Sequence, residues 1–265
     1  MRAPFKFILA PTPTTGVTSI GGLRVELESL LDRFAEGIAA VDAGTQYQSA
    51  NRRTGEDYLP GVKTMTERAF VAELLAWWRK AHGADFVPKG ASATEIPYPH
   101  LARATCDLIL STDGSPLVNP EWSIEVKHIA LVGNNGKNND YGVPKLLSPY
   151  LKDRSLIHDI YRLRNHGVGR RRAVIGYCFG YSFATCDEAL RRHPGSADVV
   201  ANLRAVCRSV DPVNGDYSVR PMVEFADEIF RMKGLVHPVL VTPFRDAWRH
   251  PCGGGGHVFG WELLR

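Results

Sequence analysis

The chain has 265 residues, 44% of them hydrophobic and 23% charged, a balance that excludes an intrinsically disordered protein and suits a globular core. Its net charge of +4, from 32 basic and 28 acidic residues, permits a polyanionic partner without requiring one. No apolar run approaches the roughly 20 residues that span a bilayer, and the first residues are too weakly apolar for a signal peptide. We therefore expect a cytoplasmic protein without a membrane partner.

Hydrophobic periodicity predicts helices and then strands in the first half of the chain. Residues 23–41 carry an apolar stripe at helical spacing, and the polar, glycine-rich segment 44–61 predicts a loop. A second helix is expected at 64–82, entered at Thr64 or Thr66. Strands are expected at 104–111 and 121–131.

The second half of the chain begins with a long polar loop at 133–154, and long loops inside compact domains are often functional. Ser155 can cap a helix at 156–166, and the β-branched and aromatic stretch 170–181 predicts a strand. Further elements are expected near the end of the chain, with helices at 185–193 and 196–209 and strands at 236–244 and 257–264.

This order of elements predicts an α/β protein, of the α+β type with a mixed β-sheet flanked by helices. We expect residues 1–60 to form a helical N-terminal extension, 61–181 a core, and 182–265 a C-terminal α/β extension packed on that core.

Three charged residues lie inside the two apolar strands of the predicted core. Asp107 opens the first apolar run, and Glu125 and Lys127 lie in the second with only Val126 between them. Glu125 and Lys127 share one face because side chains alternate along a strand. If 108–124 closes a hairpin, Asp107 lies beside them. The group is either a cross-strand ion pair or a site where two carboxylates bind Mg²⁺ and the lysine acts on a water molecule.

A further acid, Glu67, lies on the apolar stripe of the predicted helix 64–82, whereas Glu73 lies off that stripe. Glu67 should therefore face the sheet near the start of the helix. It is either a charge favoured by the helix dipole or a fourth member of the cluster.

The acid at the head of a strand, the "IEVK" strand 18 residues later and the preceding glutamate-bearing helix together resemble the PD-(D/E)XK nuclease superfamily. The resemblance covers residues 64–181 and implies a restriction-endonuclease-like core that runs helix, three strands, helix, strand. The sequence departs from the pattern in having Cys106 before the first acid. A leading strand is also not evident, and 85–90 is the candidate for it.

The resemblance implies that Asp107, Glu125 and Glu67 are metal ligands, that Mg²⁺ is the cofactor with Mn²⁺ as a possible substitute, and that Lys127 positions or activates water. It implies a metal-dependent deoxyribonuclease with a restriction or defence role that acts on double-stranded rather than single-stranded DNA and that can act as a homodimer. A DNA repair or recombination nuclease, a binding module that has lost catalysis, and a structural protein with an ion-pair network remain alternatives.

Basic and amide side chains follow the motif and predict contacts with nucleic acid, although a solvated face would look the same. The predicted contacts are Lys137, Asn138, Asn139, Lys145, Lys152, Arg154, Arg170 and Arg171.

The five cysteines are odd in number and include no CxxC pair, which predicts buried, reduced thiols. His250, Cys252 and His257, with Cys207, could bind zinc, but their spacing fits no familiar zinc motif and the intervening glycines also suit a tight turn.

Overall fold

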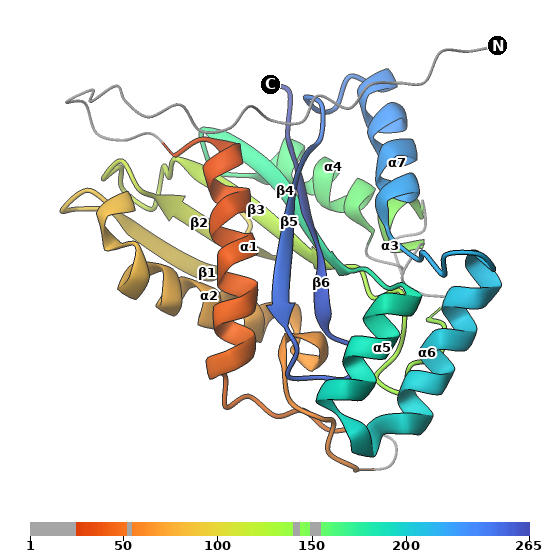
Figure 1. Ribbon diagram of the computed structural model, residues 1–265. Coiled ribbons are helices and arrows are strands. Elements are labelled where there is room, and N and C mark those ends of the chain that lie inside the picture. Colours follow the sequence, from red (N-terminus) through yellow and green to blue (C-terminus); the bar gives the residue numbers. More distant parts are fainter. Residues whose placement is uncertain (1–24, 52–54, 140–143, 149–154) are drawn as a thin grey trace, which may run out of the picture.

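The computed structural model describes residues 25–51, 55–139, 144–148 and 155–265. It is an α/β structure in which helices flank a six-stranded mixed sheet (Figure 1). The predicted fold class is confirmed. No helix within the described ranges is both long enough and apolar enough to cross a bilayer.

The elements of the first half follow the predicted order. The chain forms helix α1 (Leu27–Gly44), the 3₁₀ turn η1 (Val62–Thr64), helix α2 (Glu67–Ala81), the turn η2 (Gly83–Asp85), and strands β1 (Ala91–Pro97), β2 (Thr105–Ser111) and β3 (Trp122–His128). Thr66 begins α2, because its hydroxyl accepts a hydrogen bond from the backbone N–H of Ala69 at 3.2 Å.

The second half contains more helix than predicted. It runs α3 (Pro144–Leu147), α4 (Leu156–His166), β4 (Arg171–Phe179), α5 (Phe183–Arg192), η4 (Pro194–Ser196), α6 (Ala197–Val210), α7 (Arg220–Met232), β5 (Leu240–Ala247) and β6 (Gly254–Glu262).

Two details of the sequence interpretation are corrected. The leading strand lies at β1 rather than at the candidate segment 85–90, which holds the end of η2 and a tight turn closed by a hydrogen bond from the N–H of Gly90 to the carbonyl of Val87. Helix α7 was not predicted at all. Its start at Arg220 is followed by a proline in the first turn, where the missing N–H costs nothing.

The strand order in the sheet is β1-β2-β3-β4-β6-β5. Strands β3 and β4 are parallel, and every other neighbouring pair is antiparallel. The β2–β3 hairpin pairs Leu108 with Ile124, as expected from a hairpin over 108–124. This register puts Asp107 next to Glu125.

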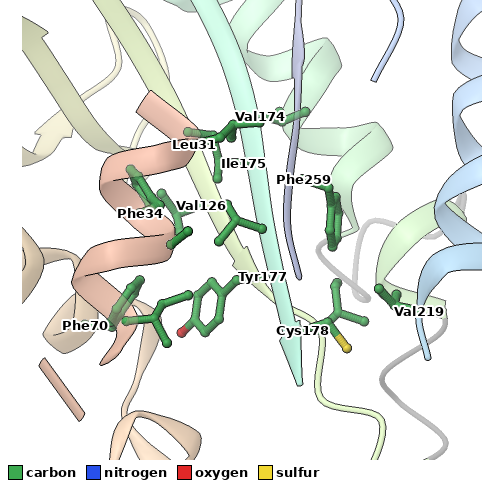
Figure 2. Packing of buried hydrophobic residues seen from close by; sticks show 14 of the residues in the cluster. Leu31, Phe34, Phe70, Val126, Val174, Ile175, Tyr177, Cys178, Val219 and Phe259 are labelled. Atoms are coloured by element: carbon green, nitrogen blue, oxygen red, sulfur yellow. The ribbon is translucent and has the colours of Figure 1, made fainter. Parts of the chain in front are cut away.

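Helices α1 and α2 cover one face of the sheet, and α4 lies on the other (Figure 1). On the first face, Phe70 of α2 packs between Phe34 of α1 and Tyr177 of β4, with ring centroids 6.3 and 4.7 Å away (Figure 2). Side chains alternate along β3, so Val126 shares this face and its neighbours Glu125 and Lys127 point to the α4 side.

Candidate functional site

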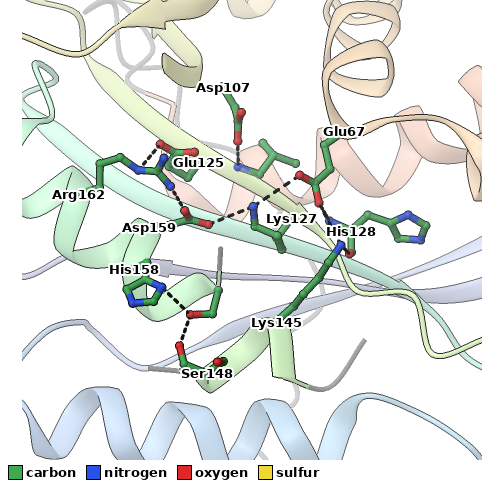
Figure 3. A network of polar contacts seen from close by, with 12 residues as sticks. Glu67, Asp107, Glu125, Lys127, His128, Lys145, Ser148, His158, Asp159 and Arg162 are labelled. Carbon is green, nitrogen blue, oxygen red and sulfur yellow. Dashed lines mark hydrogen bonds and ion pairs between the residues drawn. The ribbon is translucent and has the colours of Figure 1, made fainter. Parts of the chain in front are cut away.

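The structure brings all four predicted catalytic residues together where α2, β2 and β3 meet (Figure 3). Asp107 leans across the hairpin, and its Oδ2 accepts a hydrogen bond of 2.8 Å from the backbone N–H of Val126. Glu67 is the first residue of α2 and accepts a hydrogen bond of 3.0 Å from the N–H of His128, the last residue of β3. The predicted orientation of Glu67 toward the sheet is confirmed.

Lys127 lies between two acids. Its Nζ is 3.5 Å from Glu67 Oε2 and 3.2 Å from Oδ2 of Asp159, a residue of α4. Asp159 is fully buried and was not among the predicted site residues. It shares the buried stripe of α4 with Leu156 and Ile160, so the argument that identified Glu67 applies to it equally.

Two further residues hold Glu125. Tyr98, which follows β1, donates a hydrogen bond from its hydroxyl to Glu125 Oε1. Arg162 of α4 places its Nε 3.4 Å from the same oxygen and also pairs with Asp159. Neither residue was predicted as part of the catalytic group, because each comes from an element whose distance from β3 depends on the tertiary fold.

Burial dominates the electrostatics of the carboxyl groups. It raises the pKa of Asp107 above the usual range. The pKa of Glu125 is raised further, first by burial and then by repulsion from Asp107 and Asp159. Burial alone would lower the pKa of Lys127, but the neighbouring Asp159 and Glu67 outweigh it, so the pKa rises and the group remains an ammonium ion.

A cavity of about 760 Å³ opens onto this cluster. It runs between α4 and the β1–β2 connection, and it is lined by Thr66, Glu67, Arg68, Glu95, Leu101, Arg103, Ala104, Thr105, Asp107, Glu125, Lys127, His158, Tyr161, Arg162, Asn165 and His166. The charged cluster is therefore accessible to a ligand of nucleotide size and is not sealed within the core.

The donor set suits a hard divalent cation at Asp107 and Glu125. Four carboxyl groups, those of Glu67, Asp107, Glu125 and Asp159, surround two cations, Lys127 and Arg162, so full ionisation of the acids would leave an excess of negative charge that a divalent cation could offset. Within the described residues no three His, Cys, Asp or Glu side chains form a metal-holding group by themselves. Mg²⁺ needs only one or two carboxylates, with water and phosphate oxygens completing its shell, so the two acids fit it.

Glu67 is less well placed than Asp107 and Glu125 to bind the metal ion. Its carboxylate contacts Lys127, the N–H of His128 and, at 3.9 Å, the Nζ of Lys145. Figure 3 shows Glu67 on the opposite side of Lys127 from Glu125.

Of the predicted nucleic-acid contacts, Lys145 lies nearest to the site. Its Nζ donates to the carbonyl of His128 at 3.4 Å. Lys137, Asn138 and Asn139 do not line the cavity. Their segment is held by α6, whose Asn202 donates to the carbonyl of Asn135, and by Tyr217, which lies between α6 and α7 and donates to the side chain of Asn138.

Arg170 and Arg171 are not brought to the site. Arg170 pairs with Asp113. Arg171 is buried, makes two hydrogen bonds to Glu262 at 2.8 and 2.6 Å, and lies over the Trp122 ring, contacts that give it a structural role. Lys152 and Arg154 lie outside the described residues.

The structure does not gather the possible zinc ligands. His250 uses its Nδ1 to accept a hydrogen bond from the N–H of Cys252, and His257 lies within β6, so the segment forms the expected turn between strands. All five cysteines are buried and none is in a disulfide, as predicted.

Comparison of the chain with known protein families, curated proteins and solved structures finds no significant match. The interpretation of the site therefore depends on its own geometry.

Proposed function

We propose that the protein is a Mg²⁺-dependent endonuclease that hydrolyses phosphodiester bonds in DNA, with double-stranded DNA as the preferred substrate. The observation that carries the proposal is the convergence of Asp107, Glu125 and the Lys127 ammonium ion at the floor of an open cavity. The element order around them, a helix, three strands, a helix and a strand, supports the resemblance to the PD-(D/E)XK superfamily.

Each residue then has a defined task. Asp107 and Glu125 would hold the metal ion, which when bound supplies charge neutralisation at the phosphate and lowers the pKa of attached water. Lys127, fixed between Glu67 and Asp159, orients the attacking water and stabilises negative charge that develops on the phosphate. Its raised pKa favours this role over that of a proton acceptor.

A second class of function is favoured by a specific observation. Lys127 and Arg162 each lie between two carboxylates, which is the arrangement of a structural ion-pair network. Such a network needs no metal, so Mg²⁺ should leave the stability of the protein unchanged, whereas ligands that repel one another should be stabilised by Mg²⁺.

The first test is cleavage of supercoiled plasmid with Mg²⁺ or Mn²⁺ and with EDTA. We expect metal-dependent cleavage that falls by at least about 100-fold in Lys127→Ala and Asp107→Ala. Glu73→Gln and Lys80→Ala on the exposed side of α2 serve as matched controls and should cleave normally.

Equal cleavage by the wild type and Asp107→Ala would reveal a contaminating nuclease. No cleavage of plasmid, single-stranded DNA or RNA by the wild type would reject the enzyme and leave the binding module or the ion-pair network. A restriction or defence role, or one in repair or recombination, is a further proposal, and the banding pattern separates a sequence-specific enzyme from a nonspecific one.

A further inference from the structure

Arg162 is the residue of the cluster that connects the carboxylates to the open cavity. Its partners are enclosed, since the side chains of Glu125 and Asp159 are 3% and 0% exposed, but its own side chain is 29% exposed and lines the cavity. Of the two cations within the cluster, Arg162 is the one that can move toward a ligand, because the Lys127 side chain is only 10% exposed.

The pairing of Arg162 with Glu125 is incomplete. Arg162 Nε lies 3.4 Å from the carboxylate, and this buried atom makes no hydrogen bond of normal geometry within the described part of the chain. Arg171 offers a comparison in the same molecule, since it meets Glu262 through two short hydrogen bonds. Buried ion pairs that serve only structure need such satisfied geometry, because desolvation otherwise outweighs attraction.

The position of Arg162 also conflicts with that of a metal ion. A divalent cation held by Asp107 and Glu125 would neutralise the same carboxylate that now attracts the guanidinium, and the two cations would repel each other. Asp159 would still anchor Arg162 on the α4 side. A guanidinium freed from Glu125 could make a bidentate contact with phosphate oxygens in the cavity.

We propose that Arg162 is an exchangeable counter-ion, which pairs with Glu125 in the metal-free protein and contacts the phosphate of the substrate once a divalent cation is bound. This inference rests on the proposed function and adds a phosphate-binding catalytic residue to it. It makes two predictions of opposite sign: removing Arg162 should tighten metal binding and slow cleavage.

The test measures Mn²⁺ binding by electron paramagnetic resonance, without substrate, and plasmid cleavage at saturating metal. We expect Arg162→Gln to bind Mn²⁺ about tenfold more tightly than the wild type, the size of an ordinary coupling between two sites. Its kcat should fall by about 100-fold or more. Arg164→Gln, which removes the same charge from an exposed position of α4, should change neither quantity.

A second variant covers the case in which Arg162→Gln fails to fold. Arg162→Lys keeps the positive charge, so its Mn²⁺ affinity should stay near that of the wild type, but its cleavage should still be slow because an ammonium group cannot bind phosphate through two fixed donors.

Weaker Mn²⁺ binding in Arg162→Gln would overturn the inference, because it would mean that Arg162 supports Glu125 as a ligand. Wild-type affinity together with wild-type cleavage in that variant would overturn it too, while leaving the nuclease intact. A wild-type protein that neither binds Mn²⁺ nor cleaves DNA would overturn the proposed function itself.

Discussion

Asp107 and Glu125 are two acids held side by side with their charges largely removed from water. Their carboxyl groups are hydrogen-bonded to each other, and burial raises the pKa of both, with mutual repulsion adding to the rise at Glu125. The folded protein therefore keeps protons that the unfolded chain releases at its ordinary carboxyl pKa values of 3.8 and 4.5. Stability from these groups is complete below those values and is lost as the pH rises through the raised ones.

We accordingly expect the unfolding free energy of the metal-free protein to fall as the pH rises above these ordinary values and through the raised ones, because the buried pair must then release its protons. Asp107→Asn should reduce that loss, because it removes one of the two titrating acids and its repulsion of Glu125, while the burial of Glu125 remains. Urea unfolding in EDTA measures the unfolding free energy of the wild type and of Asp107→Asn at each pH. Subtracting one from the other cancels the contribution of the buried histidines, which both proteins share.

Addition of Mg²⁺ is the complementary experiment. At pH 8 it should raise the unfolding free energy of the wild type and have little effect on that of Asp107→Asn. A wild-type protein whose stability is the same with and without Mg²⁺ at pH 8 would instead support a self-sufficient ion-pair network.

Helices and strands could be predicted from the sequence where the spacing of the hydrophobic residues follows either the helical or the strand repeat alone. Glu67 on the apolar stripe of α2, and Asp107 opposite Glu125 in a hairpin, follow from side-chain direction alone. Asp159 offers the same signal on α4, and that signal was available in the sequence. Tyr98 and Arg162 could not be found this way, because their contacts with Glu125 arise only when α4 and the end of β1 pack beside β3.

The long polar segment after β3 was predicted as one loop that contacts nucleic acid, and the structure gives positions for only parts of it. Its described parts contact different elements, since Lys145 lies beside Glu67 and the segment of Lys137 is held near α6. Gly136 shows how tightly that second contact is made, because it has a φ of +75° and a Cβ there would lie 2.1 Å from the carbonyl oxygen of Val199. The charge and amide content of the segment predicts neither the position of Lys145 nor that of Lys137.

This difference in contacts leads to a prediction at the level of the loop. Lys145→Gln should weaken DNA binding and reduce the slope of log affinity against log salt by about one, because one phosphate contact is lost. Lys137→Gln is the matched control and should leave both unchanged. Fluorescence anisotropy with Ca²⁺ in place of Mg²⁺, at several salt concentrations, measures the two slopes, and the reverse ranking would place the DNA on the α6 side.

The described residues are built around a single sheet, which takes its strands from the predicted core and C-terminal parts and has helix α1 of the N-terminal part packed on it. Strand β6, from the C-terminal part, pairs with β4 from Ala173 to Phe179, and α1, from the N-terminal part, packs on β5 and β6. The ring of Phe259 occupies the space over Gly176, the residue that pairs with Lys127 in the sheet. The C-terminal part therefore packs directly beside the candidate site.

A fragment of residues 61–181 should for this reason not fold, although it contains every residue of the proposed catalytic cluster. Without β6, strand β4 becomes an exposed sheet edge, and without α1 the face of the sheet that carries Ile175 loses part of its cover. Circular dichroism and urea titration should show one cooperative transition for the full chain and none for the fragment. A fragment with a dispersed NMR spectrum and a transition of its own would show that the core is an independent domain, and that the C-terminal strands serve another purpose.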